Sequence, residues 1–244
     1  MTSPPKAKLE ILADSEVLAR RVAQWLYAVA ISKNGVFAVA LSGGSTPRRL
    51  YELLAQPAYG ERFPWSRTHW FWGDERFVPH DDLASNYHMV REALLAHAPV
   101  PPINIHPIPT EGVSPEAAAD AYERELKSFY GADRMDKSRQ LFDVVLLGLG
   151  IDGHTASLFP GSGVLEVRDR WVAPVQRGDS EARITLTYPA LESGRHVAFL
   201  ITGGEKRMAF SRLRRGDDDL PATRLNPSGE LICFVDQAAA GTET

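Results

Sequence analysis

Short apolar runs alternate along the chain with longer segments in which apolar residues recur every three or four positions. Runs of the first kind are typical of buried strands, and segments of the second kind are typical of amphipathic helices. We expect buried strands at residues 36–41, 68–72, 142–147, 196–201 and 231–235. We expect helices at residues 14–31, 47–54, 85–96, 114–130 and 205–215. This alternation predicts an α/β fold, a Rossmann-like open and mostly parallel sheet with helices on both faces.

Local signals add detail to this outline. Asp14 precedes the first helix and is a candidate N-cap. Residues 171–175 and 183–187 are further predicted strands, antiparallel or near an edge, because Pro174 cannot donate a hydrogen bond to a neighbouring strand. We expect the final residues, 238–244, to fray.

Length and charge restrict the class of protein. The 244 residues suit one α/β domain, which we place over residues 1–244. The net charge is −4 and no run of five like charges occurs, so nothing indicates nucleic-acid binding. No window approaches the roughly 18 apolar residues of a membrane span, and the first residues lack the apolar region of a signal peptide. We therefore expect a cytoplasmic protein without nucleic-acid or membrane partners, with a monomer favoured.

The histidines and the single cysteine do not indicate a metal centre. Cys233 cannot form a disulfide within the chain, and it lies in an apolar run. Its expected role is that of a buried core thiol, with catalysis as the alternative. Metal-ligand spacing is absent among the histidines, and we expect no metal site.

Glycines and hydroxyl side chains fill the loop between the first buried strand and the helix after it. Gly43 and Gly44 let a ligand approach the backbone closely, and the helix N-terminus offers N–H groups without helical partners. The hydroxyls of Ser42, Ser45 and Thr46 add further donors. This combination suits a phosphate, and a tight turn with hydroxyl caps explains it equally well.

Charged residues follow two other predicted strands. Asp74, Glu75 and Arg76 come after the strand at 68–72, and the guanidinium donors of Arg76 match phosphate oxygens. Lys206 lies near a helix start, where a cation opposes the helix dipole unless an anion is bound. The alternatives are an exposed charged loop and a solvated lysine.

Asp152 and His154 stand two residues apart in a glycine-rich turn that follows the strand at 142–147. A neutral imidazole, whose reference pKa is about 6.5, can take a proton from water near neutrality, and a carboxylate can orient it. A turn would bring the two side chains together, before a short segment that could begin a helix. A capped turn with a surface histidine is the alternative, and the surrounding glycines favour the catalytic interpretation.

These loops all leave the carboxyl ends of predicted strands. In an open α/β sheet such ends face one crevice. The hydroxyl-rich loop, the cations and the Asp–His pair would therefore meet in one place. Together they predict a small phosphorylated ligand more strongly than any one loop does.

Four motifs show a family resemblance over most of the chain. They are Ser42-Gly43-Gly44-Ser45-Thr46-Pro47, Gly73-Asp74-Glu75-Arg76, Ser85-Asn86-Tyr87 and Gly148-Leu149-Gly150-Ile151-Asp152-Gly153-His154-Thr155-Ala156-Ser157-Leu158-Phe159-Pro160. Together they resemble the 6-phosphogluconolactonase family, within the superfamily of glucosamine- and galactosamine-6-phosphate isomerases. The resemblance implies a Rossmann-like fold and hydrolysis of 6-phospho-D-glucono-1,5-lactone to 6-phospho-D-gluconate. That reaction is the second step of the oxidative pentose phosphate pathway and needs no cofactor.

The resemblance also implies roles for particular residues. His154 would be the base that activates water and then returns the proton to the ring oxygen, and Asp152 would position the histidine or the substrate. Arg76 and Lys206 would bind the phosphate with the loop at 42–46. Asp74 and Asn86 would contact sugar hydroxyls. Further candidates near the site are Arg183, for the phosphate or merely for pairing on its strand, and the loop at 177–182.

Two alternatives remain at this stage. Glucosamine-6-phosphate deaminases share the glycine loop and the Asp-Gly-His turn, but they carry an acid where this chain has Phe159 and a tyrosine where it has Arg76. A non-catalytic sugar-phosphate-binding protein is the second alternative, and the presence of both Asp152 and His154 argues against it. The chain has no G-x-S-x-G motif for a serine nucleophile.

Overall fold

The main sheet is parallel throughout the part of the chain that the computed structural model describes, residues 7–60, 62–136, 138–176, 178 and 180–242. Its strand order is β1-β10-β9-β6-β2-β3-β5, and every neighbouring pair is parallel. The strands are β1 (Lys8–Leu12), β2 (Phe37–Leu41), β3 (Thr68–Trp72), β5 (Ile105–His106), β6 (Phe142–Leu147), β9 (Gly194–Ile201) and β10 (Glu230–Asp236). The predicted mostly parallel α/β sheet is confirmed.

A smaller antiparallel sheet lies beside the main one. Its order is β4-β8-β7, formed by β4 (Asp74–Arg76), β7 (Val172–Val175) and β8 (Arg183–Leu186). The antiparallel prediction for the last two strands is confirmed. The expected loop at 74–76 is wrong, because these residues pair with β8. Three residues are too few to show the alternation by which a strand is recognised in sequence.

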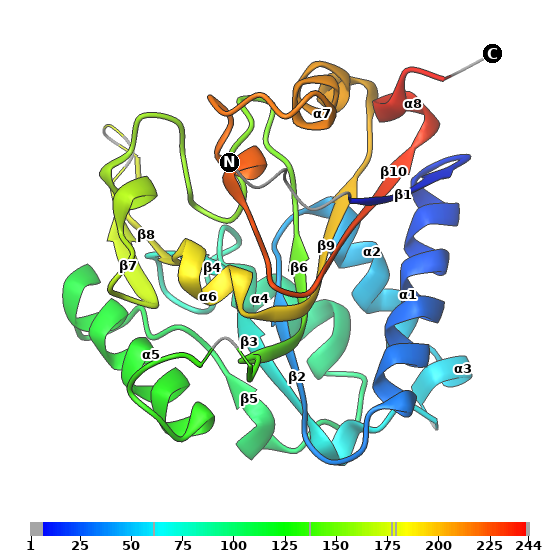
Figure 1. The fold of residues 1–244 in the computed structure, drawn as a ribbon. Helices are drawn as coiled ribbons and strands as arrows, with labels where there is room; N and C mark the ends of the chain where they lie inside the picture. Colours follow the sequence, from blue (N-terminus) through cyan, green and yellow to red (C-terminus); the bar gives the residue numbers. More distant parts are fainter. Residues whose placement is uncertain (1–6, 61, 137, 177, 179, 243–244) are drawn as a thin grey trace.

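Helices surround the main sheet, with α1 and α2 on one side in Figure 1 and α5 with the small sheet on the other. The α-helices are α1 (Ser15–Ser32), α2 (Ser45–Leu54), α3 (Pro57–Gly60), α4 (Asn86–Val90), α5 (Pro115–Tyr130), α6 (Tyr188–Glu192), α7 (Arg207–Arg214) and α8 (Gln237–Ala240). A π-helical turn, η2 (Arg91–Leu95), continues α4. Short 3-10 helices occur at η1 (Trp65–Arg67), η3 (Pro102–Asn104), η4 (Gly163–Glu166), η5 (Gly204–Lys206) and η6 (Pro221–Arg224).

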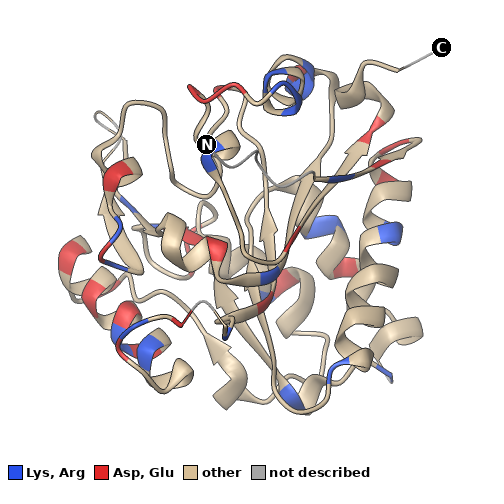
Figure 2. Ribbon diagram, viewed as in Figure 1, with Lys and Arg blue, Asp and Glu red and all other residues tan. Residues whose placement is uncertain are grey.

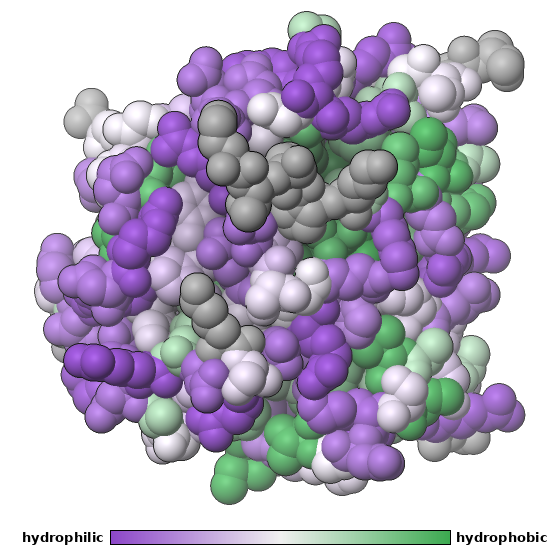
Figure 3. Space-filling model, in the orientation of Figure 1, coloured by the Kyte–Doolittle hydropathy of each residue, from purple (hydrophilic) through white to green (hydrophobic). Residues whose placement is uncertain are grey.

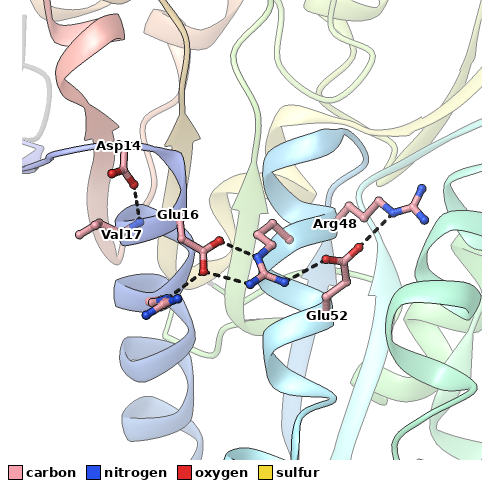
Figure 4. Close-up of polar contacts among 7 residues, drawn as sticks. Asp14, Glu16, Val17, Arg48 and Glu52 are labelled. Carbon is pink, nitrogen blue, oxygen red and sulfur yellow. Dashed lines mark hydrogen bonds and ion pairs between the residues drawn. The ribbon is translucent and has the colours of Figure 1, made fainter.

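The first two helices are joined by side-chain contacts (Figure 4). Asp14 is the predicted N-cap of α1, and its carboxylate accepts the Val17 N–H at 2.8 Å. The Glu16 carboxylate accepts from Arg49 of α2 at 2.6 Å and from Arg20 at 2.8 Å. These two hydrogen bonds lower the pKa of Glu16 to about 2. The contact fixes α2, whose first turn faces the site described below.

The buried core is apolar. Figure 2 marks where Lys, Arg, Asp and Glu occur along the ribbon, and hydrophilic residues make up most of the face shown in Figure 3. Cys233 is 5 % exposed, as expected for a core thiol, and burial raises its pKa to about 12. Within the described residues no helix is long and apolar enough to span a membrane. The largest fully buried side chains include Trp70, Trp72, Phe71, Phe142, Phe199 and Phe234.

Two local expectations are wrong. The segment after His154 does not begin a helix; Thr155 and Leu158 form an isolated bridge across a turn. The expected fraying fails for residues 238–240, because Asp236 caps α8 by accepting the Ala239 N–H at 2.8 Å. Some sequence expectations fall on residues outside the described part of the chain: the N-terminal residues 1–6, residues 177 and 179 of the loop at 177–182, and residues 243–244 of the end expected to fray.

Candidate active site

A cavity of about 360 Å³ lies at the carboxyl ends of β2, β6 and β9, next to the small sheet. It is large enough for a small polar metabolite. Asp152 does not line the cavity, but it is hydrogen-bonded to His154, which does. All other predicted site residues line it: Ser42, Gly43, Gly44, Ser45, Thr46, Asp74, Arg76, Asn86, His154, Arg183 and Lys206.

The N-terminus of α2 forms one wall of this cavity. Gly44 is its N-cap at φ 108°, a backbone conformation that favours glycine, and no side chain caps the helix. The first turn holds no acidic residue. The Thr46 hydroxyl is bonded at 2.6 Å to the hydroxyl of Thr202, which follows β9. The first-turn N–H groups and the positive end of the helix dipole are therefore available to an anion.

The loop before α2 is held from behind by a buried tyrosine. The Tyr51 hydroxyl donates to the Ser42 carbonyl at 2.8 Å and accepts the Ser42 N–H at 3.1 Å. Burial raises the pKa of Tyr51, so the phenol stays protonated and can donate. A Cβ on Gly43 would lie 2.0 Å from the Asn86 side-chain oxygen. Glycine is thus required for the loop to pack against Asn86.

Three cationic side chains surround the same cavity. Arg76 of β4 and Arg183 of β8 are directly opposite each other in the antiparallel pair, and Lys206 comes from η5. Like charges directly opposite in a sheet are destabilising, and a bound anion would offset that repulsion. Within the described residues the Arg76 Nε is buried without a hydrogen-bond acceptor, while its Nη1 donates to the Ala84 carbonyl at 2.5 Å. This part of the cavity is suited to a phosphate.

The glycine-rich turn brings the side chains of Asp152 and His154 together, as expected from the sequence. A short hydrogen bond joins His154 Nδ1 to the Asp152 carboxylate, which also accepts the His154 N–H at 3.2 Å. The Phe159 ring packs on the imidazole with centroids 4.8 Å apart. With Nδ1 bound to the carboxylate, Nε2 carries the lone pair that can accept a proton. The imidazole side chain is 28 % exposed, so water reaches it.

Two glycines make this turn possible. A Cβ on Gly150 would lie 2.0 Å from His154 Nδ1 and 2.7 Å from the Asp152 carboxylate. Gly153 has φ +83°, and its Cβ would lie 2.4 Å from the Leu220 side chain. The Gly150 N–H donates to the His154 carbonyl at 2.8 Å and closes the turn. The glycine spacing therefore serves the placement of the imidazole.

Asp74 and Asn86 line the same cavity and are linked to each other and to Ser157. The Asn86 side chain donates to the Asp74 carbonyl at 2.9 Å, and the Asp74 carboxylate accepts the Ser157 hydroxyl at 2.7 Å. Glu75 points away from the cavity, and its buried carboxylate accepts the Asn86 and Tyr87 N–H groups at 2.7 Å. Burial raises the pKa of Glu75.

Sequence reasoning missed Glu75, Ser157, Thr202 and Glu205, although the last two line the cavity. Only the observed strand β4 separates Glu75 from Asp74 and Arg76, because neighbouring residues on a strand point to opposite faces. No group of three His, Cys, Asp or Glu side chains suited to a metal ion occurs in the part of the chain that is described.

Comparison with known proteins agrees with this geometry. The family model for glucosamine-6-phosphate isomerases/6-phosphogluconolactonase matches residues 13–233. A 6-phosphogluconolactonase from Nostoc sp. is 41% identical over 244 residues, covering 98% of each chain. One from Synechocystis sp. is 40% identical over 238 residues, covering 95% of this chain and 96% of that protein.

Solved structures show the same relationship. The 6-phosphogluconolactonase from Trypanosoma cruzi superposes with a TM-score of 0.85 at 30% identity, covering 99% of this chain and 98% of that chain. The similarity in sequence and in fold thus extends over nearly the whole length of each partner. The chain belongs to the family of glucosamine-6-phosphate isomerases and 6-phosphogluconolactonases.

Proposed function

We propose that this protein is an enzyme that hydrolyses 6-phospho-D-glucono-1,5-lactone to 6-phospho-D-gluconate. One observation supports this most strongly: the imidazole of His154, oriented by Asp152, opens into the cavity that also holds three cations and the N-terminus of α2. A base and a phosphate site in one cavity suit a phosphorylated ester. The relatives named above carry the same activity in their names.

The reaction needs one group that moves a proton in both directions. His154 Nε2 takes a proton from water as the water oxygen attacks the lactone carbonyl carbon. The Asp152 carboxylate stabilises the imidazolium that forms. The tetrahedral intermediate then expels the ring oxygen, which receives the proton from Nε2. One water is consumed, the ester C–O bond breaks, and the product is an acid with a free hydroxyl.

The phosphate would bind at the opposite side of the cavity from this chemistry. Arg76, Arg183 and Lys206 provide charge, and the loop at 42–46 provides N–H and hydroxyl donors. Asp74 and Asn86, which line the same cavity, would contact sugar hydroxyls. Such binding holds the carbonyl carbon near His154 and lowers the entropic cost of attack.

The turn that carries His154 does not offer the additional acid–base group that the deaminase alternative requires. Isomerisation of an amino sugar needs a further acid–base group, and the position next to His154 is filled by the Phe159 ring. A phenyl group cannot transfer a proton. Binding without catalysis would not require the Asp152–His154 hydrogen bond.

A coupled assay with freshly generated lactone, corrected for spontaneous hydrolysis, tests the proposal. The wild-type protein should accelerate lactone opening and release no ammonia from glucosamine 6-phosphate. His154→Ala should lower kcat about 100-fold or more while 6-phosphogluconate still binds. His97→Ala, at an exposed histidine outside the cavity, is the matched control. Ammonia release without lactone hydrolysis would refute the assignment.

A further inference from the structure

Ser157 is a fully buried polar residue three positions after His154, and its hydroxyl and its backbone N–H both hydrogen-bond to the small sheet. Its hydroxyl donates to the Asp74 carboxylate of β4 at 2.7 Å. Its backbone N–H donates to the Thr185 hydroxyl of β8 at 3.2 Å. Ser157 and Thr185 are 0 % exposed and Asp74 is 7 % exposed. Buried hydrogen bonds of this kind hold their partners in fixed positions.

The strand pair that Ser157 contacts is the one that carries the two arginines. Asp74 is opposite Thr185 in the β4–β8 register, and Arg76 is opposite Arg183. Residues two apart on a strand, and residues opposite each other in a pair, lie on the same face. One face of this pair therefore holds the arginines at one end and the Ser157 contacts at the other.

The segment between His154 and Ser157 has little freedom. The Thr155 hydroxyl donates to the Gly148 carbonyl at 2.9 Å, and the Leu158 N–H donates to the Thr155 carbonyl at 2.9 Å. Ala156 has φ +47°, in the left-handed region, which is unfavourable for an L-residue. A strained residue between two anchored neighbours keeps this conformation only while the anchors hold.

We propose that Ser157 is a positioning residue for lactone hydrolysis, which ties the His154 turn to the strand pair that bears Arg76 and Arg183. The inference rests on the proposed function. A substrate held by its phosphate on β4 and β8 presents its carbonyl to His154 only if the turn and the strands keep a fixed separation. The Ser157–Asp74 hydrogen bond supplies that link, since it joins the turn directly to β4.

Ser157→Ala tests this role, with Thr68→Val as the matched control. Thr68 is also fully buried, and its hydroxyl donates one hydrogen bond to the Pro64 carbonyl at 2.8 Å, at the end of β3 away from the cavity. Each variant loses one hydrogen bond donated by a buried hydroxyl, so the two should lower the free energy of unfolding by similar amounts. Ser157→Ala should lower kcat for the lactone about 10- to 100-fold, because angstrom-scale misplacement of a catalytic group costs that much.

A fall in kcat without a change in the Kd for 6-phosphogluconate distinguishes a positioning role from general destabilisation. In Ser157→Ala the Kd for 6-phosphogluconate should stay within about twofold of wild type, and Thr68→Val should change neither quantity. Thr185→Val, which removes the acceptor of the Ser157 N–H, should show the same split and replaces Ser157→Ala if that variant does not fold.

Each outcome has one interpretation. A Ser157→Ala kcat within about twofold of wild type overturns the inference, and so does a loss of kcat and affinity in equal proportion. Failure of the wild-type protein to hydrolyse the lactone instead overturns the proposed function. Wild-type activity with an unaffected Ser157→Ala variant overturns only the role of Ser157.

Discussion

Replacing Gly150 by alanine is the most direct perturbation of the Asp–His pair that the structure offers. Gly150 does not have a positive φ, so alanine can adopt its backbone conformation without strain. The added Cβ would lie 2.0 Å from His154 Nδ1, 2.2 Å from His154 Cε1 and 2.7 Å from the Asp152 carboxylate. The effect therefore falls on the two side chains that form the pair.

The size of the effect follows from these distances. Non-bonded carbon contacts settle near 3.5 Å, so the imidazole must retreat by roughly 1.5 Å from the new methyl group. The imidazole is held between Asp152 and the Phe159 ring, so it cannot move without losing one of these contacts. A displacement of about 1 Å in a catalytic group costs about 100-fold in rate. We expect kcat for the lactone to fall about 100-fold, with 6-phosphogluconate binding retained.

Steady-state kinetics on freshly generated lactone, with product affinity from calorimetry, measure both quantities. Gly163→Ala is the matched control, because a Cβ at Gly163 meets nothing within 4 Å and Gly163 does not line the cavity. If Gly150→Ala keeps kcat within about threefold of wild type, the Asp152–His154 geometry does not determine the rate and the reasoning fails.

Three further predictions concern binding, acid stability and thiol reactivity. Arg76→Ala should raise the Kd for 6-phosphogluconate roughly 10- to 100-fold, because the variant loses a hydrogen bond to the charged phosphate. An unchanged affinity in calorimetry would contradict the assignment of Arg76 to the phosphate. Hydrogen bonds from Arg49 and Arg20 lower the pKa of Glu16 in the folded protein to about 2, below its usual 4.5. The stabilisation from the ionised Glu16 carboxylate is therefore present above pH 4.5 and is lost as the pH falls toward 2. The Tm difference between wild type and Glu16→Gln should shrink across that window, and a constant difference would exclude the linkage. Burial raises the pKa of Cys233 to about 12, so a disulfide reagent at pH 8 should label this thiol only as the protein unfolds. Rapid labelling of the folded protein would contradict this, because it would require an accessible thiolate.

The regular elements were largely predictable from sequence, since burial on both faces of a parallel sheet produces continuous apolar runs. The predicted strands at 68–72 and 142–147 coincide with β3 and β6, and the helix predicted at 114–130 coincides with α5. β1 was missed because it lies at the edge of the sheet with two of its apolar side chains, Leu9 and Ile11, exposed. Its pattern is therefore that of a surface segment.

Most residues that line the cavity were predictable, and so was the Asp152–His154 contact, but contacts between residues far apart in the sequence were not. Glycine loops and charged residues after strands indicate a site, because the carboxyl ends of parallel strands share one edge. The bond from Ser157 to Asp74 joins residues 83 positions apart, and no local pattern indicates such a pair. It depends on the register of β4 with β8, which three-dimensional packing sets.

The pairing of β1 with β10 has a consequence for biosynthesis. β1 ends at Leu12, and its parallel partner begins at Glu230, more than 200 residues later. At about 5–20 residues per second, a ribosome needs roughly 10 to 40 s to deliver that partner. Asp236, the last residue of β10, accepts the Gly203 N–H at 3.0 Å and so supports the loop that leads to Lys206. The nascent chain therefore keeps an open strand edge and an incomplete cavity until β10 has been synthesised, and β10 completes both together.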